Sequence, residues 1–503
     1  MKKQGFDNEK YLAEQAEEIL ARAGRFGSKL YLEFGGKLLF DYHAARVLPG
    51  YDPNVKIKLL HRLRDRTDII LCIYAGDIER RKLRGDFGIT YDADAMKLMD
   101  DLKEWGLNVV AVVITRFNNQ PSVRTFINRL ERRGVKVYTH RSVEGYPTAV
   151  DIIVSDRGYG SNPYIETSKP VVVVTGPGPG SGKMATCLSQ LYHEHKRGVP
   201  AGYAKFETFP IWNLPLKHPV NIAYEAATAD IGDFNQVDPF HLEAYGKTAI
   251  NYNRDVEIFS VVEHILRKIT GGAGYRSPTD MGVNRAGLAI TDDAAVREAA
   301  VQEIIRRYFR CRCEFVLGLI EQSALDKVML LLEELDLRPE NRSVVEPARN
   351  AAKEAEKRNL GSAGIYCGAA IELKNGAIVT GKNSPLLHAV SSMMLNSIKL
   401  LAGVPDKLHL LAPSIIDSIN KLKGNILNGK KLSLNLDETL IALAISATTN
   451  PAAQLAMEQL PNLRGCDVHM THIPAAGDGA GLKKIGVNAT SDPNFPSKAL
   501  FMD

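Results

Sequence analysis

A glycine-rich segment that ends in a lysine is the part of the sequence best suited to chemistry. It runs Thr175-Gly-Pro-Gly-Pro-Gly-Ser-Gly-Lys-Met184 and follows the β-branched run Val171 to Val174. We expect the run to be a buried strand and residues 183–193 to be a helix. A strand, a glycine loop and a helix N-terminus together direct backbone N–H groups and a positive dipole at an anion. The segment therefore predicts a phosphate site formed by Gly178, Gly180, Ser181, Gly182 and Lys183.

This segment departs from the P-loop pattern, which requires a glycine, four residues and then Gly-Lys-Ser/Thr. The position five before Gly182 is Pro177, and Met184 stands where the Mg²⁺-binding hydroxyl would be. Thr186 lies two residues further along the helix, about 200° round, so it cannot simply replace that hydroxyl. We therefore expect a nucleotide or phosphorylated metabolite to bind without ordinary P-loop chemistry. A tight structural turn is the alternative.

Four carboxylates lie close together in the sequence after this segment. They could hold Mg²⁺ in place of the missing hydroxyl, because hard oxygen ligands suit that ion. A polar turn with helix caps is the alternative. The four residues are Glu225, Asp230, Asp233 and Asp238.

A second polar loop, from Gly274 to Arg285, is dense in glycine, proline, asparagine and hydroxyl side chains. It could bind the remainder of a polar or anionic ligand, or it could be a structural crossover. If there is catalysis, we expect it to depend on Asp280 or Asp230. The candidate ligand-binding residues of the loop are Arg276, Ser277, Thr279 and Asn284.

Other clusters give weaker indications. Glu33-Phe-Gly-Gly-Lys37 is a second glycine turn that either lines the same cleft or forms a hairpin. His193 and His195 alternate along a predicted helix and therefore point apart, so we predict no metal site there. The sequence contains neither HExxH nor GxSxG, which leaves a protease or an α/β-hydrolase without support.

Strand-like and helix-like stretches alternate through the first 200 residues and predict a parallel sheet covered by helices. Ligands bind such sheets beyond the carboxyl ends of the strands, where the glycine loop lies. The expected strands are 29–34, 37–40, 68–74, 108–114, 135–138, 151–154 and 171–174, and the expected helices are 8–24, 56–64, 92–105 and 122–133.

The pattern along the chain predicts a multidomain α/β protein. A Rossmann-like, P-loop-like α/β domain over 1–200 ends in the glycine loop and its helix. An irregular α+β segment follows over 201–290, then a helical subdomain over 291–360 and an α/β domain over 361–503.

Composition points to an ordinary cytoplasmic protein. The chain has 503 residues and a formal net charge of only +5, so nucleic acid is not expected as its main partner. Its six cysteines are scattered without paired metal spacing, which indicates reduced thiols. The sequence contains no apolar run of membrane-spanning length, and no signal peptide is expected.

The last domain begins with a predicted hairpin, in which residues 364–373 and 377–380 flank Asn375-Gly376. The hairpin followed by His388 looks like the entry to a cytidine-deaminase-like fold. The zinc site of that fold needs a glutamate two residues after the histidine and a downstream Pro-Cys-x-x-Cys. Val390 stands in place of the glutamate, and Pro413 is followed by no cysteine. We therefore expect a deaminase-like domain without zinc, in which His388 is a core residue or binds something other than zinc.

Four segments together resemble a bacterial family of uncharacterised proteins, domain of unknown function eighteen forty-six. The resemblance covers the whole chain and implies a multidomain α/β architecture, a helical insert and a deaminase-like C-terminal part. It supplies no reaction; the residues give no support to the ATP-dependent peptidase label that some members have carried. The segments are Leu30-Tyr-Leu-Glu-Phe-Gly-Gly-Lys37, Thr175 to Met184, Ser277-Pro-Thr-Asp-Met-Gly-Val-Asn284 and Gly381-Lys-Asn-Ser-Pro-Leu-Leu-His388.

Two functions remain open at this point. The first is an enzyme that acts on a small phosphorylated ligand, with a nucleotide and Mg²⁺ as candidate cofactors. The second is a non-catalytic nucleotide or metabolite sensor, or a scaffold, built on a deaminase-like domain that has lost its metal. In either case we expect a homo-oligomer without membrane or nucleic-acid partners.

Overall fold

The computed structural model describes residues 4–84, 88–272, 274–362, 364–429 and 432–496. Its contacts divide the chain into two compact units. The N-terminal unit comprises residues 4–225 and 233–300, and the C-terminal unit comprises residues 226–232 and the chain from residue 301 onward. The short segment 226–232 thus leaves one unit for the other and returns.

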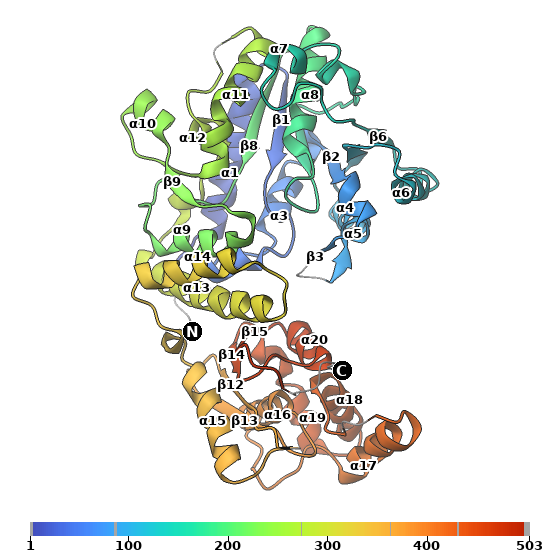
Figure 1. Ribbon diagram of the computed structural model, residues 1–503, viewed down its shortest axis with the longest axis vertical. Coiled ribbons are helices and arrows are strands. Elements are labelled where there is room, and N and C mark those ends of the chain that lie inside the picture. Colours follow the sequence, from blue (N-terminus) through green and yellow to red (C-terminus); the bar gives the residue numbers. More distant parts are fainter. Residues whose placement is uncertain (1–3, 85–87, 273, 363, 430–431, 497–503) are drawn as a thin grey trace. The chain divides into compact units, whose positions relative to one another are not determined.

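The N-terminal unit is built on a sheet of seven strands, all of them parallel, as the α/β alternation predicts. Every residue of β1, β7 and β8 is buried, which explains why these strands lack an alternation of apolar and polar residues. The strand order is β11-β8-β1-β7-β2-β5-β6. Figure 1 labels β8, β1, β2 and β6 of this sheet. The strands are β1 (Lys29–Phe34), β2 (Thr67–Tyr74), β5 (Val109–Thr115), β6 (Val137–Thr139), β7 (Val171–Thr175), β8 (Ala201–Phe206) and β11 (Gly282–Val283).

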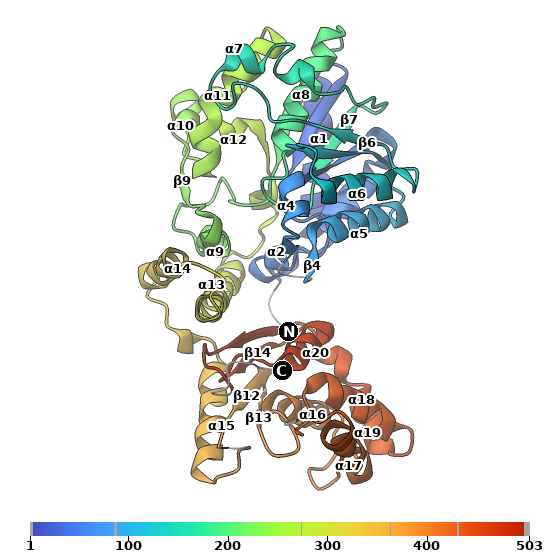
Figure 2. The ribbon, with the colours of Figure 1, turned by 45° about the vertical axis from the view of Figure 1, so that its right-hand side comes forward.

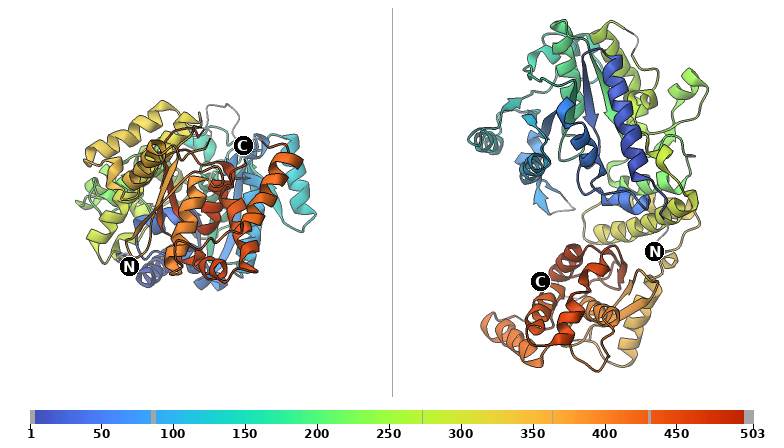
Figure 3. Two further views of the ribbon diagram at one scale, coloured as in Figure 1. Left: turned by 90° about the horizontal axis from the view of Figure 1, so that it is seen from below. Right: turned by 180° about the vertical axis from the view of Figure 1, so that it is seen from behind.

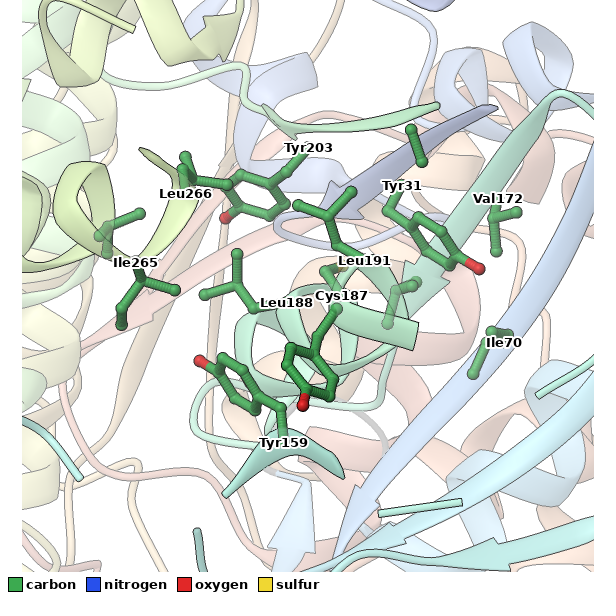
Figure 4. Packing of buried hydrophobic residues seen from close by; sticks show 14 of the residues in the cluster. Tyr31, Ile70, Tyr159, Val172, Cys187, Leu188, Leu191, Tyr203, Ile265 and Leu266 are labelled. Atoms are coloured by element: carbon green, nitrogen blue, oxygen red, sulfur yellow. The ribbon is translucent and has the colours of Figure 1, made fainter. Parts of the chain in front are cut away.

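Helices cover both faces of this sheet, because alternate strand residues point to opposite sides. On one face Tyr31, Ile70 and Val172 pack against α8 (Lys183–Lys196) and α11 (Asn253–Thr270) (Figure 4). On the other face the neighbouring strand residues, such as Leu71 and Val112, pack against α5 (Tyr91–Glu104) and α6 (Pro121–Glu131), which lie side by side in Figure 2.

One long helix, several short helices and four short strands complete the N-terminal unit. The long helix α1 (Asn8–Arg25) runs along the sheet in the right-hand view of Figure 3 and begins where the Asp7 side chain accepts a hydrogen bond from the Lys10 N–H. The other elements are α2 (Tyr42–Val47), α3 (Val55–Arg62), α4 (Ala75–Glu79), α7 (Val150–Ile153), α9 (Pro219–Ala227), α10 (Pro239–Tyr245), α12 (Pro278–Met281), β3 (Leu83–Arg84), β4 (Ile89–Thr90), β9 (Asn235–Val237) and β10 (Ile250–Tyr252).

Two predicted strands are wrong. Residues 37–40 form no strand, because β1 already has β7 on one side and β8 on the other and so has no free edge for a hairpin partner. Residues 151–154 lie instead in and just after the helical turn α7, since a short apolar run does not distinguish a strand from a helix. Residues 201–290, expected to be irregular, contribute β8 and β11 to the sheet.

The C-terminal unit contains a smaller mixed sheet in the order β13-β12-β14-β15. The predicted hairpin is confirmed, since β12 and β13 pair antiparallel around Asn375-Gly376. Within this unit α14 packs against the 3₁₀ turn of residues 229–231. The strands are β12 (Gly368–Glu372), β13 (Ile378–Lys382), β14 (Asp467–Met470) and β15 (Asn488–Ser491), and the helices are α14 (Gln322–Glu334), α15 (Val345–Lys357), α16 (Ala389–Leu401), α17 (Pro413–Lys421), α18 (Leu436–Ala447), α19 (Pro451–Met457) and α20 (Ala476–Ile485). The remaining helix, α13 (Asp293–Val316), spans the boundary between the units along the chain.

Candidate functional site

The glycine loop lies where the sequence predicts it, between β7 and the N-terminus of α8. Gly182 is the N-cap of α8 and has a φ of +89°, a conformation that side chains disfavour. A Cβ atom at this position would also lie 2.7 Å from Cγ2 of Thr115. At Gly178 a Cβ atom would lie 2.4 Å from the ring of Tyr91. Glycine is therefore required at these two positions by the fold of the loop itself.

Two residues at the end of β5 form hydrogen bonds with the backbone of the glycine loop. Thr115 donates a hydrogen bond from Oγ1 to the Ser181 carbonyl, at 2.8 Å. The next residue, Arg116, donates from Nη2 to the Gly180 carbonyl, at 2.5 Å, and its guanidinium lies 3.5 Å from the ring centroid of Tyr74. These contacts hold the loop and bring a second cation beside it. Sequence reasoning missed Arg116, although its position directly after a strand of the parallel sheet could have indicated it.

Lys183 curls back over the loop that precedes it. Its Nζ donates to the Gly178 carbonyl at 3.3 Å and to Ser181 Oγ at 3.5 Å. The first turn of an α-helix leaves four N–H groups without intrahelical acceptors and carries the positive end of the helix dipole. Lys183 and the start of α8 together form a cationic, donor-rich surface that can bind an anion.

Thr186 is buried in the sheet face. It is completely buried, and its Oγ1 lies 3.4 Å from the thiol of Cys72. The Thr186 hydroxyl thus makes its contact with β2, as expected from its place on the helix.

The glycine loop follows β7, and from β7 and the adjacent strand β1 the chain continues in opposite directions across the sheet. From β1 the chain moves through α2 and α3 to β2, whereas from β7 it moves through α8 to β8, on the other side of β1. Adjacent strands whose connections leave in opposite directions create a crevice at their carboxyl ends, the usual ligand site of open α/β sheets. Gly35 and Gly176 follow β1 and β7 at this crevice. The glycine loop, which begins just after β7, therefore lies at the usual ligand position of such a sheet.

A cluster of buried charged side chains lies at the carboxyl end of the neighbouring strand β8. Lys205 contacts Glu207 Oε1 at 3.0 Å and makes closer contacts with the Asp255 carboxylate and the Tyr252 hydroxyl. On β1, Glu33 accepts a hydrogen bond of 2.7 Å from Tyr203. Burial and the neighbouring Asp255 carboxylate hold the pKa of Glu207 well above its ordinary value, although the Lys205 ammonium acts against this. Lys205, Glu207 and Asp255 were missed by sequence reasoning, which assigned no strand to residues 201–206.

The predicted polar loop makes contacts within the protein. Ser277 is buried and caps α12 by accepting from the Asp280 N–H at 2.9 Å, and its Oγ also lies 2.9 Å from His241 Nδ1. The Thr279 hydroxyl donates to Asp238 Oδ2 at 2.6 Å. Asn284 is buried and donates to the Pro210 carbonyl at 2.9 Å. These contacts give the three side chains structural partners, and their role toward a ligand stays a prediction.

Arg276 and the two candidate catalytic aspartates lie in different surroundings. Arg276 is exposed, with its guanidinium 5.0 Å from the ring centroid of Tyr245. Asp280 accepts a hydrogen bond of 3.3 Å from the Arg276 N–H. Asp230 is exposed and belongs to the C-terminal unit, whereas Asp280 belongs to the N-terminal unit.

Three of the four carboxylates proposed to hold Mg²⁺ have protein partners. Asp233 pairs with Arg254 at 2.6 Å, Glu225 accepts from the Asn235 N–H at 3.2 Å, and Asp238 caps α10. Across the described part of the chain, no three His, Cys, Asp or Glu side chains are grouped so that they could hold a metal ion.

In the C-terminal unit His388 is the N-cap of α16. Its Nδ1 lies 2.7 Å from Asp478 Oδ2, and Asp478 Oδ1 accepts from the Leu436 N–H at 2.8 Å. His469 is buried, with Nδ1 2.9 Å from Thr490 Oγ1. Both histidines thus have partners within the unit.

Comparison with known proteins finds similarity over almost the whole chain. The model described as "Domain of unknown function DUF1846, N-terminal" matches residues 4–336, and its C-terminal counterpart matches residues 340–501. A "UPF0371 protein" of Clostridium botulinum strain Alaska E43 is 56% identical over 99% of both chains. That of Clostridium tetani strain Massachusetts is 54% identical over the same share. Within the described ranges, no helix combines the length and apolar character needed to cross a membrane.

Proposed function

This chain belongs to the family described as Domain of unknown function DUF1846, and we propose that it binds a nucleotide or another small phosphorylated metabolite at the glycine loop. The observation that carries the proposal is the position of this loop, at the start of α8 and at the reversal point of a parallel sheet. A helix N-terminus at such a point supplies N–H donors and a favourable field to a phosphate.

The side chains around the loop support an anion rather than a neutral ligand. The Lys183 ammonium lies over the loop, within 3.3 Å of the Gly178 carbonyl, and would turn toward a phosphate that entered. Arg116 adds a second positive charge beside Gly180. Two cations and the helix dipole act in the same direction on a phosphate. Arg276, Ser277, Thr279 and Asn284 remain candidates for the rest of the ligand, and Asp280 and Asp230 remain candidate catalytic groups.

The finer fold assignments belong to the same proposal. We infer a P-loop-like scaffold for the N-terminal sheet, with Met184 in the place of the metal-binding hydroxyl. For the C-terminal unit we infer a deaminase-like scaffold, supported by its four-stranded sheet and by the helix α16 that follows the hairpin at His388. Its zinc-binding residues are replaced, so no zinc chemistry is proposed there.

The test is thermal stability of the full chain against a panel of nucleotides, sugar phosphates and inorganic phosphate, with and without Mg²⁺. A ligand at about 100 times its Kd should add roughly 2.7 kcal/mol to the free energy of unfolding. We expect the shift in the wild type to shrink in Lys183→Ala and to persist in Lys103→Ala, which removes an exposed lysine of α5. Equal shifts in all three proteins would refute phosphate binding at the loop.

A further inference from the structure

The row of residues beside the glycine loop continues across three strands on one face of the sheet. The register aligns Glu33 of β1 with Val174 of β7 on one side and with Lys205 of β8 on the other. Two residues further along the chain, just past the ends of these strands, are Gly35, Gly176 and Glu207. Side chains two apart on a strand point to the same face. Gly35 and Gly176, which carry no side chains, therefore follow the strands that lie between the glycine loop and Glu207.

Glu207 is part of a compact charged cluster. Its Oε1 lies 3.0 Å from Lys205 Nζ, which also contacts Asp255 and the Tyr252 hydroxyl. All three side chains are largely buried, and Glu207 is the least so, with 10% of its side chain exposed against 8% for Lys205 and 4% for Asp255. Glu207 is thus the member of the cluster that a ligand could reach.

The distance between neighbouring strands determines how long a ligand must be to reach from the glycine loop to Glu207. Neighbouring strands of a sheet lie about 4.8 Å apart, and one strand separates β7 from β8, so roughly 10 Å divide the loop from Glu207. A sugar phosphate, free or within a nucleotide, can span this distance with its phosphate at the loop and a hydroxyl at Glu207.

We propose that Glu207 is a proton-transfer residue for a sugar phosphate moiety bound across the end of β1, with its phosphate at the glycine loop. The Glu207 carboxylate takes the proton of a ligand hydroxyl and becomes a carboxylic acid, and the Lys205 ammonium stabilises the ligand oxyanion that results. The reverse transfer returns the proton, so no further reactant is needed. This inference rests on the proposed phosphate site and adds a chemical step to it.

The charges around Glu207 suit this role. Two carboxylates share one ammonium ion, so the cluster disfavours a negative charge on both of them at once. The pKa of Glu207 is accordingly raised by burial and by Asp255, which allows the side chain both to accept and to donate a proton near neutrality. The other titratable or charged groups nearby are Glu33 of β1, which has Tyr203 as its partner, Tyr224 of α9, Tyr252 and the Arg254–Asp233 ion pair.

The test measures binding of inorganic phosphate, ribose 5-phosphate and adenosine monophosphate by calorimetry between pH 5.5 and 8.5. The proteins are the full-length wild type, Glu207→Gln, Lys183→Ala and Glu131→Gln, the last a control at an exposed residue of α6. We expect at least one organic phosphate to bind the wild type about tenfold more tightly than inorganic phosphate, with proton exchange that depends on pH. Because the phosphate group itself titrates in this pH range, proton exchange is compared between proteins for the same ligand. Glu207→Gln should bind inorganic phosphate as the wild type does and should exchange fewer protons than the wild type on binding the organic phosphate, whereas Glu131→Gln should match the wild type.

The outcomes distinguish the role of Glu207 from phosphate binding at the glycine loop, on which it rests. If Lys183→Ala leaves phosphate binding unchanged, the phosphate site itself is refuted. If phosphate binding requires Lys183 but Glu207→Gln keeps the wild-type proton exchange, only the role of Glu207 is overturned. Glu207→Asp, which retains a carboxyl group, should recover part of the exchange and guards against a folding defect in Glu207→Gln. Preference for the nucleotide or the free sugar phosphate identifies the source of the moiety.

Discussion

Lys205, Glu207 and Asp255 combine one positive and two negative groups in the interior of the N-terminal unit. Removing Lys205 alone would leave two carboxylates without their ammonium ion, whereas removing one carboxylate would leave a balanced ion pair. The stability of this cluster therefore depends on the protonation of Glu207, whose pKa is raised in the folded protein.

Glu207→Gln should alter the pH dependence of stability. Because the pKa of Glu207 is raised in the folded protein, the unfolded chain releases this proton first as pH rises. The contribution of Glu207 to the free energy of unfolding should therefore be intact below the ordinary glutamate pKa of about 4.3 and decline above it until the raised folded value is reached. Urea unfolding from pH 4 to 8 should show this decline in the wild type and in Glu131→Gln but a flatter profile in Glu207→Gln. The same slope in all three proteins would contradict the prediction.

Asp492→Asn tests a carboxylate shifted in the opposite direction. Burial acts to raise the pKa of Asp492, but the nearby His469, with Nε2 3.6 Å from Oδ1, and the hydrogen bonds from Arg349 outweigh it and lower the pKa to about 2. Arg349 holds both carboxylate oxygens, at 3.0 and 2.7 Å. The stabilisation is thus present above the ordinary aspartate pKa and lost as pH falls toward 2. The substitution should cost roughly 1–3 kcal/mol at neutral pH in chemical denaturation, and less at pH 2.5. A pH-independent cost would indicate a packing defect instead.

At the scale of elements, the glycine loop offers a matched pair of substitutions. Gly180 and Gly182 both have positive φ angles, but a Cβ atom at Gly180 would meet nothing within 4 Å, whereas one at Gly182 would crowd Thr115. Gly180→Ala should cost about 1–2 kcal/mol for the backbone conformation alone. Gly182→Ala should cost more, because Thr115 and its bond to the Ser181 carbonyl must shift. Equal melting temperatures for the two variants would show that the loop does not need its contact with β5.

The elements that sequence predicts well are those whose signal is local. β7 and α8 follow from a β-branched run, a glycine loop and an amphipathic helix, and the hairpin at Asn375-Gly376 follows from a two-residue turn signal. The failure at residues 37–40 arose because the neighbours of β1 are distant strands. Lys205 and Glu207 were missed for the same reason, because their proximity to Glu33 depends on strand order and register. The position of the glycine loop was thus predictable, and the neighbouring charged cluster on β8 was not.

At the scale of the molecule, each unit has its own hydrophobic core. Leu188 is buried in the core beneath α8, and Leu443 is buried in the core of the C-terminal unit. Each leucine-to-alanine substitution should cost about 2–5 kcal/mol within its own unit. In calorimetry of the full chain we expect two transitions, of which Leu188→Ala lowers one and Leu443→Ala the other, while inorganic phosphate raises only the transition sensitive to Leu188→Ala. A single transition lowered equally by both variants would show that the units unfold together.

The excursion of residues 226–232 also has a consequence for how the protein is made. On the ribosome this segment emerges well before α14, against which its 3₁₀ turn packs. The last strand of the parallel sheet, β11, is synthesised between the two. The nascent chain can therefore assemble the large sheet before residues 229–231 meet α14, and translation must continue through Glu334 for that contact to form. Consequently, no single cut in the polypeptide releases both units intact.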